Sequence, residues 1–329
     1  MTPAPAVVVV ATGGTIASRP SAEGGTAPAL GGDAITASAG ASAPVRVVDL
    51  MAEDSAALDL ARMQEIADAV ADALADPHTT GVVVLHGTDS LEETALLVGL
   101  QCGADPRPIV LTGAQFLPDD PRSDGPANVA AALAIASGEA AAPRHPATGG
   151  AVIVFGGRVL PAWGASKART DDADAFRRSG DASGAPVLAA PALAAPALAT
   201  ARRAHDGVAR VRVDVVAVVP GGDDLHLRAS AAAGARAVVL EALGSGNASP
   251  AIVEGVRRCV DQGVRVAVTS RVPEGALAAT YGGGGGGHDL VVAGAAMART
   301  LRAGQARILL AELLARGMAD DAIAAALAA

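Results

Sequence analysis

Residues 7–17 read VVVVATGGTIA, and this segment gives the strongest indication of the fold. Four consecutive valines are typical of a strand buried on both faces, as the strands of parallel sheets are. The run ends in Thr12, two glycines and Thr15. Ligands of open α/β sheets bind just beyond the carboxyl ends of the strands, so Thr12 stands where a reacting group would be useful. The glycines would let the backbone approach a small ligand closely.

The rest of the chain alternates strand-like apolar runs with helical patterns. Strands are predicted at 7–11, 45–50, 81–85, 109–112, 151–155, 211–219, 236–240 and 264–269. Helices are predicted at 59–75, 91–101, 126–138, 249–262 and 299–315. Strands separated by single helices indicate βαβ units and a parallel sheet. We therefore predict an α/β fold, in which a larger N-terminal domain has a mainly parallel sheet flanked by helices and a smaller C-terminal α/β domain follows.

Three segments without a clear period divide this pattern. Residues 18–42 are rich in Gly, Ala, Ser and Pro, and a connection of that length is often a lid. Prolines in 183–200 prevent a continuous helix, so we expect an extended hairpin or linker there. The glycine run Gly282–Gly287 is expected to be a flexible surface loop. The predicted domains are accordingly 1–200 and 208–329, joined by a linker at 201–207.

Composition excludes several classes of protein. A net charge of −9 and an aromatic content of 2% argue against a nucleic-acid partner. No apolar run approaches the roughly 18–20 residues of a membrane span. The two cysteines form no CxxC or Cys/His cluster, so neither a zinc site nor a disulfide scaffold is expected. The first strand begins almost at residue 1 without a charged leader, so a cytoplasmic location is expected.

A second dense cluster occupies residues 82–94, which read VVVLHGTDSLEET. A buried strand again leads into a glycine and a threonine, Thr88, here followed by Asp89. Ser90 is expected to cap the next helix, with Glu93 completing a capping box. The cluster by itself fits a strand-to-helix turn with its cap as well as it fits a site. The repetition of the Thr12 pattern favours the site.

Two threonines at strand ends suggest a hydroxyl nucleophile, which is weak and needs a base or a cation nearby. Lys167 follows the strand predicted at 151–155, in a chain whose basic side chains are otherwise mostly Arg. A lysine can serve as a base where an arginine cannot, although a lone lysine is more often a solvated surface group. His86 and His226 are interpreted as structural. The first loop has no nucleotide-binding glycine pattern, although anion binding at a helix N-terminus stays open.

Taken together, these segments resemble the bacterial-type L-asparaginases, which are threonine-dependent amidohydrolases. The matching pieces occur in family order across almost the whole chain. They are ATGGTIA at 11–17, Asp54-Ser55, HGTDSLEET at 86–94, Thr112–Ala114, Ser123–Gly125 with Asn128, Lys167 with the following Arg-Thr-Asp-Asp, Gly246-Asn247, and Ser270–Pro273. The resemblance implies a two-domain α/β enzyme that hydrolyses L-asparagine to L-aspartate and ammonia without a cofactor or a metal.

The resemblance also implies roles for the clustered residues. Thr12 would be the first nucleophile and would form an acyl-enzyme that water then cleaves. Thr88, Asp89 and Lys167 would form a second, triad-like group on the opposite side of the substrate. Acyl transfer needs a hydroxyl, a proton acceptor and backbone N–H groups for the oxyanion, and this set is consistent with that need.

Substrate-binding roles are implied for five positions. Asp89 would meet the α-amino group of the substrate, and Ser55 its α-carboxylate. Thr15 would lie beside the nucleophile, and the Ala114 backbone near the side-chain amide. Asn247 would be a contact across subunits. The resemblance implies a homotetramer, built as a dimer of dimers, with sites shared between paired subunits.

Two departures from the family pattern stand out. The family usually carries a Tyr on the loop after the first strand, but residues 18–42 contain none, and the only tyrosine is Tyr281. An acidic residue that many members supply from a neighbouring subunit has no Glu counterpart at 281–288. We predict low activity on glutamine. The alternatives are a related amidase, acting on glutamine or an amidated tRNA, and a catalytically silent amino-acid-binding protein on the same fold.

Overall fold

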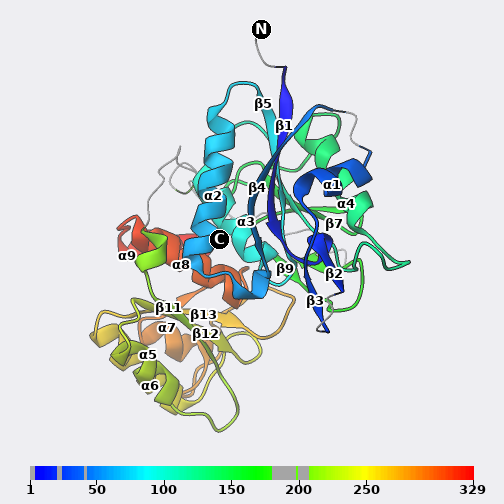
Figure 1. The fold of residues 1–329 in the computed structure, drawn as a ribbon. Helices are drawn as coiled ribbons and strands as arrows, with labels where there is room; N and C mark the ends of the chain where they lie inside the picture. The colour runs from blue at the N-terminus through cyan, green and yellow to red at the C-terminus, as the bar shows by residue number, and fades with distance from the viewer. Residues whose placement is uncertain (1–3, 21–23, 41–42, 180–197, 199–206) are drawn as a thin grey trace. The chain divides into compact units, whose positions relative to one another are not determined.

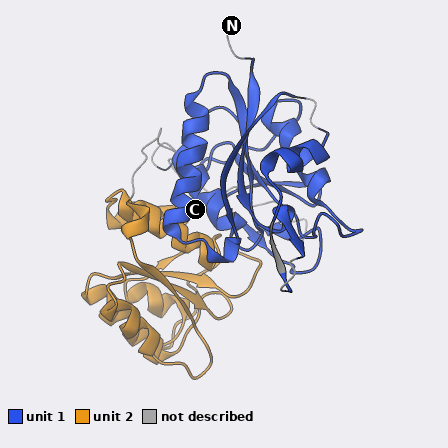
Figure 2. Ribbon diagram, in the orientation of Figure 1, with its two compact units in different colours: residues 1–178, 194–204 blue, residues 179–193, 205–329 orange. Residues whose placement is uncertain are grey.

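The structure is a computed structural model that describes residues 4–20, 24–40, 43–179, 198 and 207–329. These residues divide into two compact units, shown in blue and orange in Figure 2. The first reaches to Arg178 and the second includes residues 207–329. The predicted linker at 201–207 and the segment 183–200 lie almost wholly outside the described residues. Both therefore stay predictions.

The first unit is built on a six-stranded sheet in the order β4-β1-β5-β6-β7-β8. Its strands are β1 Ala6–Gly13, β4 Val45–Glu53, β5 Thr79–Leu85, β6 Ile109–Thr112, β7 Ala151–Phe155 and β8 Arg158–Pro161. All neighbouring pairs are parallel except β7 and β8, which form an antiparallel hairpin. The predicted mainly parallel sheet is therefore confirmed.

Helices cover both faces of this sheet (Figure 1). Val8 and Val10 face a core shared with α2 Leu60–Ala75 and α3 Leu91–Cys102. Val7 and Val9 face the opposite core, shared with α1 Gly32–Ser38 and α4 Gly125–Ala136. All four valines are at most 1% exposed. Because alternate side chains of a strand point to opposite faces, an unbroken valine run satisfies both layers at once.

The second unit has a parallel four-stranded sheet in the order β11-β12-β13-β14. Its strands are β11 Val213–Ala217, β12 Ala237–Ala242, β13 Arg265–Ser270 and β14 Ala296–Met297. Its helices are α5 Leu225–Ala232, α6 Pro250–Asp261, α7 Gly287–Val292, α8 Ala303–Ala315 and α9 Asp320–Leu327, after a 3₁₀ turn η4 at Val208–Arg210. This is the smaller α/β domain that the sequence predicts. Within the described residues of the chain, no helix combines the length and apolar character needed to cross a membrane.

The segment 18–42 is more structured than predicted. Its described residues contain a short antiparallel hairpin, β2 Ser18–Pro20 with β3 Thr26–Pro28, followed by α1. Strands of three residues and a helix of seven are too short to show a period in the sequence. Ile35 of α1 is nevertheless buried against the sheet, so the helix has a core face of its own.

The glycine run 282–287 is only partly the loop that was expected. Gly286 precedes the first turn of α7 and Gly287 begins that helix, and both are buried. The Asp289 carboxylate accepts hydrogen bonds from the N–H groups of Gly284 and Gly286, at 2.8 and 2.9 Å. The end of the run therefore serves to start a helix, which composition by itself does not reveal.

Candidate active site

Thr12 lies near the end of β1, at the carboxyl edge of the sheet. Its side chain is buried, and its hydroxyl donates a hydrogen bond of 2.8 Å to the Leu85 carbonyl at the end of β5. The neighbouring strand therefore fixes the position of this hydroxyl. Thr15 begins a short 3₁₀ turn, η1 Thr15–Ala17, and is partly buried just beyond the same strand end.

Gly14 allows this turn to touch the turn after β5. Its φ of +80° lies in the left-handed region that favours glycine. A Cβ at this position would lie 2.4 Å from the Cα of Gly87, closer than atoms can approach. The two glycines thus bring the Thr12 turn and the Thr88 turn into main-chain contact.

Lys167 brings the second cluster together. Its Nζ lies 2.7 Å from Thr88 Oγ1 and 2.7 Å from Asp89 Oδ1. The side chain of Lys167 is 18% exposed and that of Asp89 is 56% exposed, while Thr88 is buried. Lys167 ends β9 Ala165–Lys167, which pairs antiparallel with β10 Phe176–Arg178. It is also the only lysine of the 329-residue sequence.

Ser55 supports the turn that carries Asp89. It begins η2 Ser55–Ala57 after β4 and is 2% exposed. Its hydroxyl accepts the Asp89 N–H at 3.1 Å, and its carbonyl accepts the Ser90 hydroxyl at 2.7 Å. The predicted capping box of Ser90 and Glu93 is therefore wrong. Ser90 does precede α3, but its hydroxyl is engaged by Ser55 and caps no helix N–H.

Glu92 is a neighbour of Lys167 that the sequence did not single out. Its Oε1 accepts the main-chain N–H of Lys167 at 3.2 Å. Burial raises the pKa of Glu92 to about 7, against the opposing effect of the main-chain N–H groups that it accepts. The turn at 88–92 therefore holds Lys167 both by its ammonium and by its backbone. The motif HGTDSLEET contained this residue, but nothing local indicated which distant group it meets.

Ala114 is buried directly after β6, in a segment held by carboxylate and amide side chains. Asp124 Oδ1 accepts the N–H groups of Gln115 and Phe116, both at 3.0 Å. Asn128 donates to the Gly113 carbonyl at 3.0 Å. The Ala114 backbone is thus fixed from both sides, as a group that must orient an amide would need to be.

His86 and His226 differ in their surroundings. His86 is fully buried; its Nδ1 donates to the Gly87 carbonyl at 2.7 Å, so its Nε2 accepts from Thr94 Oγ1 at 3.0 Å. Burial lowers the pKa of His86 to about 4, so the ring is neutral near pH 7. These contacts support the interpretation of His86 as structural, whereas His226 is exposed.

Asn247 lies in the second unit, on the turn after β12. Its Oδ1 accepts the Gly287 N–H at 3.1 Å, and the residue forms an antiparallel bridge with Leu243. Its expected contact with substrate stays a prediction.

Among the residues that the structure describes, no group of three or more His, Cys, Asp and Glu side chains is arranged to hold a metal ion.

Comparisons with known proteins point in one direction. The family model "Asparaginase, N-terminal" matches residues 6–189, and "Glutaminase/Asparaginase C-terminal domain" matches 212–327. A probable L-asparaginase of Deinococcus radiodurans is 33% identical, covering 97% of this chain and 96% of that protein. A subunit of the glutamyl-tRNA(Gln) amidotransferase of Methanopyrus kandleri is 32% identical; the match covers 81% of this chain and 61% of that one.

A solved structure supports the same fold. The thermostable L-asparaginase from Thermococcus kodakarensis superposes with a TM-score of 0.77 at 24% sequence identity, over 98% of this chain and 96% of that one.

Proposed function

The chain belongs to the asparaginase family, and we propose that it converts L-asparagine and water to L-aspartate and ammonia through a threonine acyl-enzyme. The main support for this proposal is that Lys167 Nζ lies 2.7 Å from both Thr88 and Asp89. A second threonine, Thr12, lies at the end of the neighbouring strand. A hydroxyl, an amine and a carboxylate at the carboxyl edge of a parallel sheet are the parts that amide hydrolysis requires.

In the proposed first step, Thr12 Oγ attacks the side-chain carbonyl carbon of asparagine. Main-chain N–H groups at the glycine-bordered strand ends stabilise the oxyanion that forms. The tetrahedral intermediate then expels the amide nitrogen, which takes up the proton that the Thr12 hydroxyl has lost and leaves as ammonia. The product of this step is an ester between Thr12 and the aspartyl group.

In the proposed second step, water cleaves that ester. The Thr88 hydroxyl accepts the proton of the attacking water while passing its own proton to the Lys167 amine. Asp89 holds Lys167 in place and stabilises the ammonium that results. When the ester breaks, the proton returns to Thr12 Oγ, and aspartate is released.

Recognition of a free amino acid is proposed for the residues around this relay. Asp89 is 56% exposed even with Lys167 in contact, so its carboxylate is accessible to the α-ammonium of a substrate. The Ser55 hydroxyl would hold the α-carboxylate, with Thr15 beside the nucleophile. The backbone of Ala114 would orient the amide, and Asn247 would contribute across a subunit boundary in a cytoplasmic homotetramer arranged as a dimer of dimers.

An amidated tRNA is the second candidate, because one relative is named as part of a glutamyl-tRNA(Gln) amidotransferase. The net charge of −9 is unfavourable for binding a polyanion, whose affinity comes largely from Lys and Arg contacts with phosphates. A free amino acid is therefore the substrate that we propose.

The test is ammonia release from L-asparagine and L-glutamine by the purified full chain. We expect kcat/KM for asparagine to exceed that for glutamine by about 10-fold or more, the usual effect of one extra methylene in a site. Comparable values would contradict the low glutaminase activity. Binding of aspartate without ammonia from either amide would favour the silent binding protein instead.

A further inference from the structure

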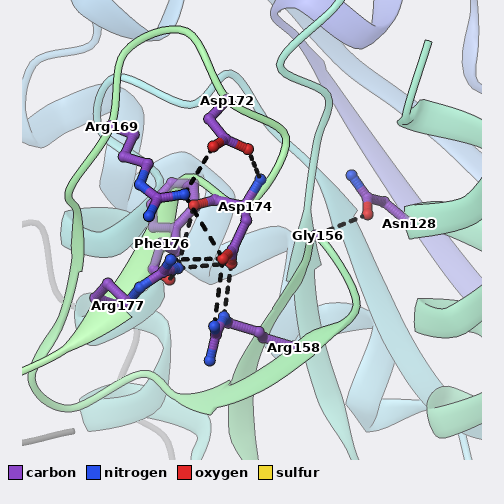
Figure 3. Close-up of polar contacts among 8 residues, drawn as sticks. All are labelled: Asn128, Gly156, Arg158, Arg169, Asp172, Asp174, Phe176 and Arg177. Carbon is purple, nitrogen blue, oxygen red and sulfur yellow. Dashed lines mark hydrogen bonds and ion pairs between the residues drawn. The ribbon is translucent and has the colours of Figure 1, made fainter. Parts of the chain in front are cut away.

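Asp174 is the centre of a cluster of charges on the loop between β9 and β10 (Figure 3). Arg158, which begins β8, donates a hydrogen bond of 2.6 Å from Nε to Asp174 Oδ1. Arg177, on β10, donates a hydrogen bond of 2.6 Å from Nη1 to the same oxygen. These two guanidinium groups hold the pKa of Asp174 well below its usual range. The carboxylate therefore links the edge of the main sheet to the hairpin that carries Lys167.

The loop that Asp174 closes begins at the residue after Lys167. Residues 168–175 connect β9 to β10, and the N–H groups of Ala168 and Arg169 donate to the Ala175 carbonyl, at 2.7 and 3.2 Å. Lys167 pairs in register with Phe176, which is buried and packs edge-on against Phe155 with ring centroids 5.0 Å apart. The backbone position of Lys167 thus depends on the conformation of this loop and on the packing of Phe176.

Gly156 shows how closely the loop is seated on the turn between β7 and β8. Its φ is +55°, and a Cβ there would lie 2.4 Å from the Ala173 carbonyl and 2.9 Å from the Asp174 Cα. The Gly156 N–H donates to Asn128 Oδ1 at 3.0 Å (Figure 3). Because Asn128 also holds Gly113, the loop and the Ala114 segment share one support.

We propose that Asp174 is a positioning residue for Lys167, fixing the β9–β10 hairpin so that Nζ reaches both Thr88 and Asp89. Removal of the carboxylate would leave Arg158 and Arg177 facing each other without the acceptor that both use. Hydrogen bonds between charged partners are about twice as strong as neutral ones, so a neutral amide would not replace it. A displacement of about 1 Å at a catalytic group can lower the rate about 10²-fold.

The kinetic test compares Asp174→Asn with Asp171→Asn. Both changes remove one carboxylate from the same loop, but Asp171 is exposed. We expect Asp174→Asn to lower kcat by about 10-fold or more with KM changed less than about threefold, and Asp171→Asn to leave both near wild type. Asp174→Glu, which keeps the carboxylate, should recover part of the lost kcat.

A second readout uses the single lysine of the chain. Lysine labelled with ¹³C at Cε gives one side-chain signal, which reports the surroundings of Lys167 without assignment. We expect this signal to shift in Asp174→Asn and to overlay wild type in Asp171→Asn. If Asp174→Asn fails to fold, Arg158→Gln replaces it, with a smaller change in the same direction because Arg177 remains.

The kinetic arm rests on the proposed function, whereas the lysine signal does not. If the wild-type chain releases no ammonia, the proposed function fails. The lysine signal still tests whether Asp174 positions Lys167. An unmoved signal, an unchanged kcat in an active enzyme, or a loss of activity that only follows the folded fraction in thermal unfolding would overturn the inference.

Discussion

The two threonine turns of the site are alike in sequence and different in surroundings. Thr12 lies near the end of β1 and Thr88 follows β5, and these two buried strands lie side by side in the sheet. The Thr12 hydroxyl meets a main-chain carbonyl, that of Leu85. The Thr88 hydroxyl meets the amine of Lys167, 79 residues further along the chain. One threonine donates to a main-chain carbonyl, and the other accepts a hydrogen bond from Lys167 Nζ.

Two turns of similar sequence can therefore have different chemical tasks. A carbonyl oxygen can orient a hydroxyl but cannot remove its proton, whereas an amine can do both. In the proposed mechanism, the Thr12 turn presents the nucleophile and the Thr88 turn moves protons. The family's usual lid Tyr is missing from the sequence of 18–42, which sharpens the question of what activates Thr12.

The largest effect is expected at Thr12 itself. Thr12→Ala removes a hydroxyl and a methyl at a strand end, so turnover should fall by about 10³-fold or more, while the fold is retained. Ammonia release and circular dichroism would measure the two consequences. Thr12→Ser is the matched control, because it keeps the nucleophile. Normal activity in the alanine variant would refute the assignment of Thr12 and move the nucleophile to the other turn.

The next effect is expected at Lys167. Lys167→Met should lower kcat by about 10²–10⁴-fold, the range typical of a general acid–base group. Lys167→Arg keeps the positive charge but offers no base, so it should stay impaired as well. Recovery in the arginine variant would mean that charge by itself is needed. A raised KM with normal kcat would assign Lys167 to binding.

The smallest effect concerns stability at Glu92, which contacts the Lys167 backbone. Its pKa rises from an ordinary 4.5 to about 7 on folding, so the folded state retains a proton that the unfolded state has lost between these values. This contribution to stability is present at low pH and is lost as pH rises towards 7 and beyond. Its full size is about 3 kcal/mol.

Glu92→Gln, which is neutral at every pH and keeps an acceptor, isolates this effect. The variant should match wild type near pH 4 and exceed its free energy of unfolding near pH 8. Urea denaturation at several pH values would measure the difference. The His86 ring titrates in the opposite sense, because its lowered pKa weakens the folded state as pH falls, but it is common to both proteins. If the difference in free energy of unfolding between the two proteins does not vary with pH, burial does not raise the pKa of Glu92.

Predictions from sequence succeeded where the signal is local and repeated. The valine run of β1 and the long amphipathic pattern of α2 identified their elements, because burial imposes a period on neighbouring residues. The helices α1 and α7, of seven and six residues, span too few turns to show one. The prediction that Ser90 caps α3 is wrong because a hydroxyl before a helix has the same local pattern whether it caps that helix or donates to the Ser55 carbonyl.

The parallel α/β architecture, the glycine-bordered turns and the positions of both threonines could be predicted from the sequence, since strand period and turn chemistry are encoded within a few residues. The groups that those threonines contact are set by the packing of distant segments against one another. Lys167, Glu92 and Asp174 gain their places from contacts between β9, the start of α3 and the edge strand β8. Such contacts join residues far apart in the chain, and no local pattern specifies them before the sheet brings its carboxyl edge together.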